Sequence, residues 1–294
     1  WSSDVCSSDL TVVTVDDVTR AVAALCARHP RAVLLERGLA LGATLAPVNA
    51  VDDLLAFAHL DDRRFWVGAD VDGTAVRAPG VAFRLDGRRP EARRRYRPSA
   101  PGAHDVSPDT VPRWARRTAP EASGSGPLPF SGLKVADFSW IGVGPITAKC
   151  LADHGATVVR VESQNRIDGL RVQPPMKDGV FGINRSNFYG AFNTSKLGLA
   201  LDLRTAAGRA VALRLATWAD VVIDSFTPGV MERLGLGPAD IRAVNPSVVT
   251  VNTSLLGHDG RHSSMAGYGY HAAALAGFFG AVGDRKSTRL NSSH

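Results

Sequence analysis

The sequence has little cysteine, little methionine and few aromatic residues. It contains three Cys and three Met in 294 residues, and Phe, Trp and Tyr together make up 7%. Cys26 and Cys150 lie far apart, each within an apolar helical pattern, and Cys6 lies in a serine-rich end segment. Such isolated thiols exclude a disulfide framework and favour a reducing compartment, so we expect a cytoplasmic location.

Long hydrophobic runs are also missing. No apolar run approaches the roughly 20 residues of a membrane span, and 45% hydrophobic residues are typical of an α/β protein with a packed core. Much of the net charge of +6 comes from arginines between Arg84 and Arg117. A nucleic-acid-binding patch is one interpretation, but interleaved Pro, Gly, Ser and Asp favour a solvated segment. We expect neither a membrane nor a nucleic-acid partner.

The two ends of the sequence are related at the DNA level. The peptides W-S-S-D-V-C-S-S-D-L and D-R-K-S-T-R-L-N-S-S can be encoded by strings that are nearly reverse complements, and both strings resemble sequencing adapters. We therefore interpret residues 1–10 and 284–294 as adapter-derived and leave them out of the fold prediction. On this interpretation the natural termini lie outside the sequence.

Residues 11–105 and 106–129 differ in composition. The first segment has a helical pattern at residues 18–26, a short apolar run at 32–35 that predicts a strand, and a second predicted helix near 52–59 with Asp52 as N-cap. The second segment is rich in Pro, Ser, Ala and Gly, which indicates a linker.

From Gly132 onward, predicted strands alternate with predicted helices. Parallel pairing with crossover helices follows from this alternation, so we predict an α/β fold with a Rossmann-like, open, mostly parallel sheet. The predicted strands are 135–138, 157–162, 220–223 and 248–253. The predicted helices are 145–153, 205–217, two short helices that start near Pro228 and Pro238, and 271–279.

A glycine turn, Gly142-Val143-Gly144-Pro145, connects the first predicted strand to its helix. A helix N-terminus behind such a turn offers unpaired N–H groups to a phosphate, and Glu162 occupies the place of a ribose-binding acid. However, Thr147 replaces the third glycine of the dinucleotide fingerprint and Pro145 removes a donor. A nicotinamide-dependent dehydrogenase and a purely structural turn both stay open.

Five segments in a fixed order carry a more specific signal: G-L-K-V-A-D-F-S-W-I-G-V-G-P, L-A-D-H-G-A-T-V-V-R-V-E, F-N-T-S-K-L-G-L-A-L-D-L, A-D-V-V-I-D-S-F-T-P-G-V-M-E-R-L-G-L and N-P-S-V-V-T-V-N-T-S-L-L-G-H-D-G. Together they resemble the N-terminal Rossmann-like part of class III CoA-transferases, the family of formyl-CoA transferase and carnitine CoA-transferase. The segments A-T-L-A-P-V-N-A-V-D-D-L-L and A-P-G-A-H-D resemble the C-terminal end of the same fold.

This order implies a tandem of two copies. Residues 11–105 would be a small α+β segment from the end of a first copy, 106–129 a linker, and 130–283 the truncated large domain of a second copy. Members of the family form interlocked dimers, so the resemblance implies either such a homodimer or an intramolecular pseudo-dimer.

The resemblance implies that CoA moves from an acyl-CoA to a free carboxylic acid, without a metal. In the family an aspartate attacks the thioester to give a mixed anhydride and CoA thiolate, and the thiolate returns to form an enzyme-bound thioester that the acceptor acid resolves. That aspartate follows a pair matched by Val282-Gly283, and Lys286 stands in its place. We therefore assign no catalytic residue and expect this chain alone to be inactive.

The resemblance also implies a set of CoA contacts, namely Ile141, Gly142, Val143, Leu201, Arg204, Ser225, Phe226 and Arg233. The first three match the loop along the pantetheine and nucleotide, and the next two match positions near the adenine and its phosphates. Ser225 and Phe226 match a pair that lines the slot. Arg233 matches a phosphate-binding arginine, whose guanidinium can pair with two oxygens at once. The family often has Gln at position 142, Arg at 163 and Asn at 225, where this sequence has Gly, Ser and Ser.

Two alternatives stay open within the family. This copy could be a non-catalytic half that completes the interlocked structure, or the parent protein could be a racemase, isomerase or lyase. Racemases of the family use a histidine in a G-H-D stretch, where this sequence has Gly267-Tyr268-Gly269. A phenol with a pKa near 10 is a poor base at neutral pH, and His271 is predicted to be a helix N-terminal residue.

The parent gene distinguishes the catalytic copy from the scaffold copy. If this copy is catalytic, sequencing the gene across Gly283 should reveal an aspartate codon within a few positions. A parent gene without that codon would support the scaffold role instead.

Overall fold

The computed structural model describes residues 14–71, 73–90 and 127–282. These described residues divide into two compact units, one that contains residues 14–56 and 265–282 and the other that contains those between 57 and 264. Both proposed adapter segments, the predicted linker up to residue 126 and most of the arginine-rich segment lie outside the described residues.

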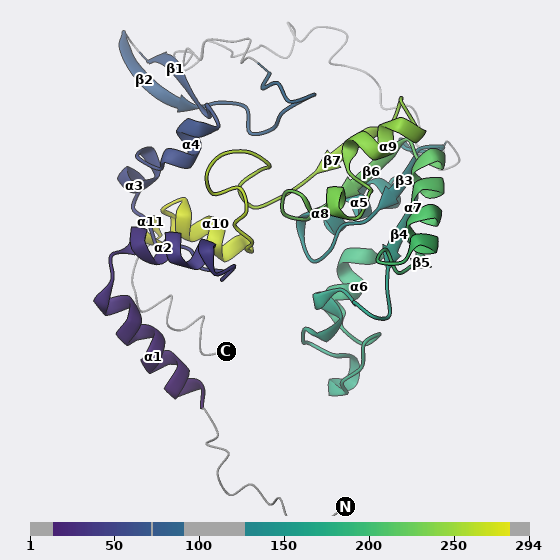
Figure 1. Ribbon diagram of the computed structural model, residues 1–294, viewed down its shortest axis with the longest axis horizontal. Coiled ribbons are helices and arrows are strands. Elements are labelled where there is room, and N and C mark those ends of the chain that lie inside the picture. The colour runs from purple at the N-terminus through teal and green to yellow at the C-terminus, as the bar shows by residue number, and fades with distance from the viewer. Residues whose placement is uncertain (1–13, 72, 91–126, 283–294) are drawn as a thin grey trace, which may run out of the picture. The chain divides into compact units, whose positions relative to one another are not determined.

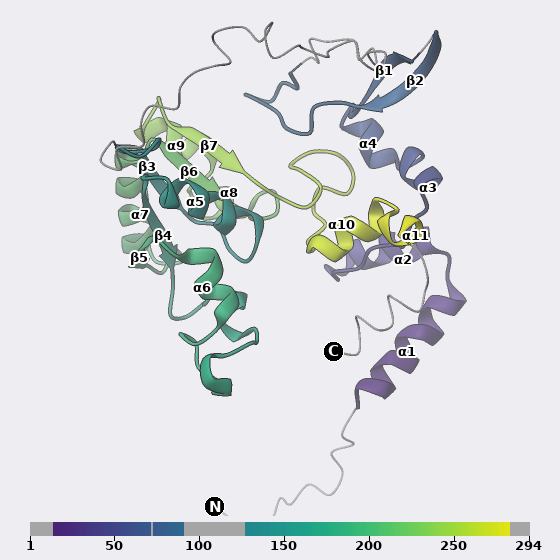
Figure 2. The same cartoon turned by 180° about the vertical axis from the view of Figure 1, so that it is seen from behind.

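The described part of the first unit is helical. Its helices are α1 (Val15–Arg28), α2 (Arg31–Ala40), α3 (Val51–Leu55), α10 (Gly269–Leu275) and α11 (Phe278–Ala281). In both views α10 and α11 lie next to α2 and α3 (Figures 1 and 2). Asn49 ties the two segments together, because its backbone and side-chain N–H groups donate to the carbonyls of Ala274 (2.9 Å) and Leu275 (3.1 Å).

Three predictions for this unit need correction. The predicted strand at 32–35 is wrong, because these residues belong to the helix α2, in which Leu35 is buried. A short apolar run does not by itself distinguish a strand from a helix. The predicted helix near 52–59 is two helices, and its N-cap is Ala50, whose N–H donates to Asp53 rather than Asp52. The predicted helix at 271–279 begins earlier and is interrupted at Gly277, which has a left-handed φ of 76°.

The second unit contains a five-stranded parallel sheet, which confirms the predicted fold class. The strands are β3 (Lys134–Asp137), β4 (Thr157–Glu162), β5 (Leu197–Ala200), β6 (Val221–Asp224) and β7 (Val249–Asn252). Their order in space is β5-β4-β3-β6-β7, and all four pairings are parallel. The edge strand β5 was not predicted, although leucines alternate with Gly198, Ala200 and Asp202 in this segment.

Helices cover both faces of the sheet (Figure 1). Neighbouring residues of β3 point to opposite faces: Val135 packs with Ala148 and Ala152, and Ala136 packs with Ala212 and Ala216. Small side chains four residues apart on one helix let its backbone approach the sheet closely. The helices of this α/β layer are α5 (Val143–Asp153), α6 (Asn187–Asn193), α7 (Ala206–Trp218), α8 (Val230–Arg233) and α9 (Pro238–Val244), with 3-10 turns η2 (Gly169–Val172) and η3 (Lys177–Gly179).

A charged side chain is buried where β5 begins. The Lys196 side chain is 1% exposed, and its ammonium donates to Asp137 Oδ2 and the Pro145 carbonyl (both 2.8 Å) and to Asn193 Oδ1 (2.9 Å). Asp137 is fully buried at the end of β3. This contact therefore joins β3, α5 and α6 through a paired charge, as burial of an ion requires.

The same unit contains α4 (Ala58–Asp62) and an antiparallel hairpin of β1 (Trp66–Val71) and β2 (Thr74–Pro79). The hairpin was missed, although an Asp-Gly dipeptide between apolar residues is a strong hairpin signal. His59 of α4 is fully buried: its Nδ1 accepts the His262 N–H (3.1 Å), so its Nε2 must donate to the Leu256 carbonyl (2.9 Å). These bonds require the neutral imidazole.

The stability of this unit should depend on His59 protonation. Burial lowers the pKa of His59 below its usual value near 6.5; Arg63 and His262 act in the same direction, while the bond to the Leu256 carbonyl and the charge of Asp62 oppose them. Below about pH 6.5 the unfolded chain binds this proton more readily than the folded one, so the free energy of unfolding should fall as the pH falls from 7.5 to 5.5. Urea unfolding at several pH values measures this decrease.

His59→Ala should lose this part of the pH dependence and, at pH 7.5, lower the free energy of unfolding by about 1–3 kcal/mol, because two buried polar groups lose their partner. The exposed His258 offers a matched control, and His258→Ala should keep the wild-type pH slope. An unchanged slope in His59→Ala would contradict the assignment.

Removing the buried ammonium should strongly destabilise the sheet. We expect Lys196→Met to lower the free energy of unfolding by about 3–5 kcal/mol, because Asp137 keeps its charge and loses its nearest cation. Asp137→Asn added to it should recover part of the loss. The half-buried Lys149, which pairs with Asp153 one helical turn away, is the control, and Lys149→Met should cost no more than about 1 kcal/mol. If the effects of Lys196→Met and Asp137→Asn on the free energy of unfolding simply add in the double variant, the pairing of Lys196 with Asp137 is excluded.

Candidate functional site

The carboxyl ends of the parallel strands define one edge of the sheet. From β3 the chain proceeds outward to β4 and β5, and then returns to the other side of β3 to form β6 and β7. The loops after β3 and β6 therefore leave in opposite directions. In open α/β sheets, ligands bind in the crevice at this switch point.

The loops after β3 and β6 contact each other at the switch point. The Ser225 hydroxyl accepts the Trp140 N–H (2.8 Å) and donates to the Trp140 carbonyl (2.9 Å). The Phe226 ring meets the Trp140 indole edge-on, with centroids 5.6 Å apart. Ser225 and Phe226, both predicted CoA contacts, thus lie directly beside the predicted contact loop 141–143.

That loop turns sharply into α5. Ile141 has a left-handed φ of 68°, Gly142 is the N-cap of α5, and Val143 is 69% exposed. A Cβ on Gly144 would lie 2.3 Å from the Ser139 Cβ, so packing requires this glycine regardless of any ligand. The N–H groups in the first turn of α5 have no partner within the helix, and the positive end of the helix dipole lies there.

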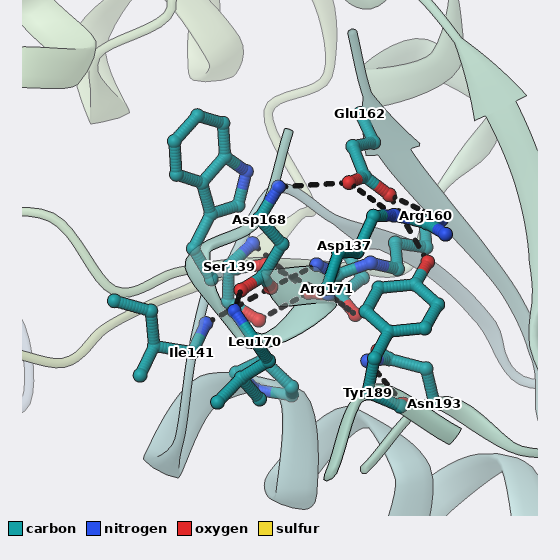
Figure 3. A network of polar contacts seen from close by, with 12 residues as sticks. Asp137, Ser139, Ile141, Arg160, Glu162, Asp168, Leu170, Arg171, Tyr189 and Asn193 are labelled. Atoms are coloured by element: carbon teal, nitrogen blue, oxygen red, sulfur yellow. Dashed lines mark hydrogen bonds and ion pairs between the residues drawn. The ribbon is translucent and has the colours of Figure 1, made fainter. Parts of the chain in front are cut away.

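A buried ionic cluster lies directly under this loop (Figure 3). Arg160 of β4 is 3% exposed; it donates through Nη1 to the Ser139 carbonyl (2.9 Å) and pairs through Nη2 with Asp168. Asp168 is fully buried, and its Oδ2 also accepts the Ile141 N–H at 3.0 Å. Its Oδ1 accepts the Leu170 N–H (2.9 Å) and caps η2. The cluster therefore fixes the backbone of the contact loop at the Ser139 carbonyl and the Ile141 N–H.

Sequence reasoning missed Arg160 and Asp168. The sequence did contain a signal for Arg160. It lies in the apolar strand T-V-V-R-V-E, and an arginine on a buried face of a strand needs a charged or polar partner. The identity of the partner was not readable, since Asp168 follows the strand in an irregular segment.

Glu162 does not present a free carboxylate. Its Oε1 accepts from Arg171 Nε (2.7 Å) and the Asp168 N–H (2.8 Å), and its Oε2 accepts from Arg171 Nη2 (2.8 Å) and the Tyr189 hydroxyl (3.0 Å). Although burial opposes it, these donors together hold the pKa of Glu162 below its usual value. With every oxygen engaged, Glu162 is a structural anchor for the segment around η2 and α6, which disfavours the dinucleotide interpretation.

The remaining predicted contacts lie farther along the same edge. Leu201 follows β5 and packs against the hydrophobic core. Arg204 is exposed and pairs with Asp202 through Nε (3.0 Å) and Nη2 (2.8 Å), and this bonding raises the pKa of Arg204 and lowers that of Asp202. Arg233 is exposed on α8, and no ion-pair partner for it is found among the described residues. Within the described part of the chain, no hydrogen bond or ion pair joins these three residues to the 141–143 loop.

The structure gives His271 a structural contact. Its Nδ1 accepts the Tyr268 N–H (3.0 Å) at the start of α10. Across the described ranges there is no group of three or more His, Cys, Asp or Glu side chains placed to hold a metal ion. No helix in the described part of the chain has the length and apolarity to cross a bilayer.

Comparison with known proteins gives a consistent assignment. A probable CoA-transferase of Mycobacterium tuberculosis, Rv1866, is 33% identical over 266 residues, which cover 87% of this chain and 31% of that protein. The succinate–glutarate CoA-transferase of Agrobacterium fabrum is 33% identical over 53% of this chain and 40% of its own length. Human alpha-methylacyl-CoA racemase is 32% identical over 53% of this chain and 36% of its own length.

The chain thus spans about one third to two fifths of the length of these relatives. The model of CoA-transferase family III matches residues 130–293, which include the whole parallel sheet and the loops at its carboxyl edge. The chain belongs to CoA-transferase family III.

Proposed function

We propose that the parent protein transfers CoA from an acyl-CoA thioester to a free carboxylic acid, and that this chain supplies part of the CoA-binding surface. The observation that carries the proposal is the junction of Trp140 with Ser225 and Phe226 at the switch point of the sheet. It sets two loops from different strands side by side where an open α/β sheet binds its ligand. Family membership supports CoA as that ligand.

The chemistry of CoA suits the groups along this edge. The pantetheine is narrow and amide-bearing, and Ile141, Gly142 and Val143 offer backbone groups on a half-exposed loop. The helix N-terminus behind them and the exposed Arg233 favour negative charge, which fits the phosphates. Arg204 can contribute beside Leu201 near the adenine, but it must share its guanidinium with Asp202.

The proposed reaction needs a carboxylate nucleophile. Its attack on the acyl-CoA carbonyl expels CoA thiolate and leaves an acyl-aspartyl anhydride. The thiolate then attacks the aspartyl carbonyl, which releases the donor acid and leaves an aspartyl-CoA thioester. The acceptor carboxylate and the returning thiolate repeat these steps in reverse, which regenerates the aspartate. We assign this nucleophile to no residue of the described chain.

The tandem arrangement is part of the proposal. The match to Rv1866 extends over 87% of this chain, whereas the two other relatives match 53% each. Residues 57–90 also pack within one unit with the loop at 256–262, through His59 and through an ion pair between Arg63 and Asp259. Both observations support an intramolecular pseudo-dimer, in which this copy either reacts or serves as a scaffold. We place the protein in the cytoplasm, consistent with free Cys26 and Cys150.

A racemase or another isomerase of the family is the second candidate, and the 32% identity to alpha-methylacyl-CoA racemase favours it. Racemisation needs a base near the substrate α-carbon. His271 is engaged at the start of α10 and Tyr268 is exposed, so neither supplies such a base in the described residues. Transfer of CoA is the better-supported activity, because the matching family model and the relatives from Mycobacterium tuberculosis and Agrobacterium fabrum are all named as CoA-transferases.

Titration of the chain with CoA tests the proposed CoA-binding surface. We expect saturable binding of CoA and none of NAD at the same concentrations. Arg233→Ala should weaken CoA binding about tenfold or more, since a charge-assisted bond to phosphate contributes about 1.5–3 kcal/mol. Arg242 on α9 is an exposed arginine away from this edge, and Arg242→Ala should bind CoA like the wild type. Preference for NAD over CoA would overturn the proposal.

The activity itself is tested on the full-length parent protein. Incubation of an acyl-CoA with an isotopically labelled free acid should give labelled acyl-CoA for at least one pair, which mass spectrometry detects. Failure of exchange over a broad panel of dicarboxylic and short-chain acids, together with α-proton exchange into the same acyl-CoA, would favour the racemase.

A further inference from the structure

The contact loop depends on a backbone conformation that its own sequence disfavours. Ile141 has φ 68°, and a β-branched residue rarely adopts the left-handed region, because its Cβ crowds the following carbonyl. Such a conformation persists only where the surrounding structure enforces it. Ile141 is the residue that turns the chain from β3 into α5, so the enforcing contact sets the path of the loop.

The enforcing contact is the carboxylate of Asp168. It accepts the Ile141 N–H at 3.0 Å from a fully buried position. Arg160 fixes that carboxylate by pairing with it and donates at the same time to the Ser139 carbonyl, two residues before Ile141. Through this pair, the loop is fastened to β4 and to the N-terminus of η2.

The loop is held on its other side by Ser225, whose hydroxyl bonds both the backbone N–H and the backbone carbonyl of Trp140. The two contacts are chemically different. The Ser225 contact is neutral and joins the loop to β6, whereas the Asp168 contact is made by a charged carboxylate and acts on Ile141, the residue of the loop 141–143 with a left-handed φ. Asp168 therefore determines the turn, and Ser225 determines which strand the turn lies against.

We propose that Asp168 is a positioning residue for coenzyme A binding: its bond to the Ile141 N–H holds the left-handed turn that aims the 141–143 loop and the first turn of α5 at the ligand. This inference rests on the proposed function. Asp168 itself is buried and does not touch the ligand. Its effect passes through Ile141, so the two residues must be energetically coupled.

The coupling is measured with a double-mutant cycle. Asp168→Asn keeps the size of the side chain but weakens the tether, and it should raise the Kd for CoA about tenfold, as expected for the loss of a charge-assisted bond. Asparagine adopts the left-handed region far more readily than isoleucine. In an Ile141→Asn background the same Asp168→Asn change should therefore raise the Kd less than threefold. Equal effects in both backgrounds would overturn the proposal.

Hydrogen exchange without CoA provides a second measurement that does not depend on the proposed function. In Asp168→Asn, a peptide covering residues 138–144 should exchange faster than in the wild type, while peptides from α7 keep wild-type rates. If the wild type does not bind CoA but this loop-specific increase is seen, the proposed function fails and the positioning role of Asp168 stands. An increase spread evenly over the sheet would show a general structural role and contradict the inference.

Two further variants complete the design. Asp178 pairs with Arg185 at the surface of the same unit, and Asp178→Asn should change neither the Kd nor the exchange of residues 138–144. If Asp168→Asn does not fold, Arg160→Lys replaces it, because a lysine keeps the charge but lacks the two separate Nη atoms through which Arg160 reaches the Ser139 carbonyl and Asp168. The same loop-specific increase is expected from it, and wild-type exchange of the loop in Arg160→Lys would overturn the proposal.

Discussion

Buried ion pairs hold the carboxyl edge of the parallel sheet together. Asp137 and Asp168 are both fully buried, and each has a buried cation next to it, Lys196 for the first and Arg160 for the second. An isolated ion at these positions would be strongly unfavourable, and each becomes tolerable only because its partner and several backbone groups satisfy it. The positions of β3, β4 and the start of η2 are therefore coupled through these ion pairs, and α5 is joined to them by the hydrogen bond from Lys196 to the Pro145 carbonyl.

This coupling matters for function because it acts at the switch point. Hydrophobic side chains pack on both faces of the sheet, including Ala148 and Ala152 of α5 and Ala212 and Ala216 of α7. At the carboxyl edge the chain instead presents backbone N–H groups, a helix N-terminus and loops from two strands. The buried ion pair of Arg160 and Asp168 fixes the backbone of the half-exposed loop 141–143, and such preorganisation would favour the binding of a flexible ligand such as the proposed CoA.

The neighbouring Glu162 illustrates how similar folds diverge. Its place at the end of β4 is that of the ribose-binding acid in dinucleotide-binding folds. Here four donors occupy its carboxylate, and Arg171 stacks on Tyr189 at 3.6 Å from the ring centroid. The carboxylate thus stabilises the segment from η2 to α6 and is not available to bind a ligand. The same residue type at the same position has a different role because its surroundings satisfy it first.

The sequence by itself determined the α/β class, the bounds of the strand β4, the end of α5 at Asp153 and the start of α9 at Pro238. These follow from local patterns: apolar alternation, capping residues and proline geometry act over a few residues and need no partner. It also pointed to the loop 141–143 and to Ser225 and Phe226, through motif resemblance.

Only the tertiary structure decided which of these residues meet, because strand order is set by long-range pairing that no local pattern encodes. The short apolar run at 32–35 became a helix, since its burial depends on distant segments. The pairing of Arg160 with Asp168 was not predictable for the same reason: the two side chains come within reach of each other only when the segment after β4 folds back over the strand.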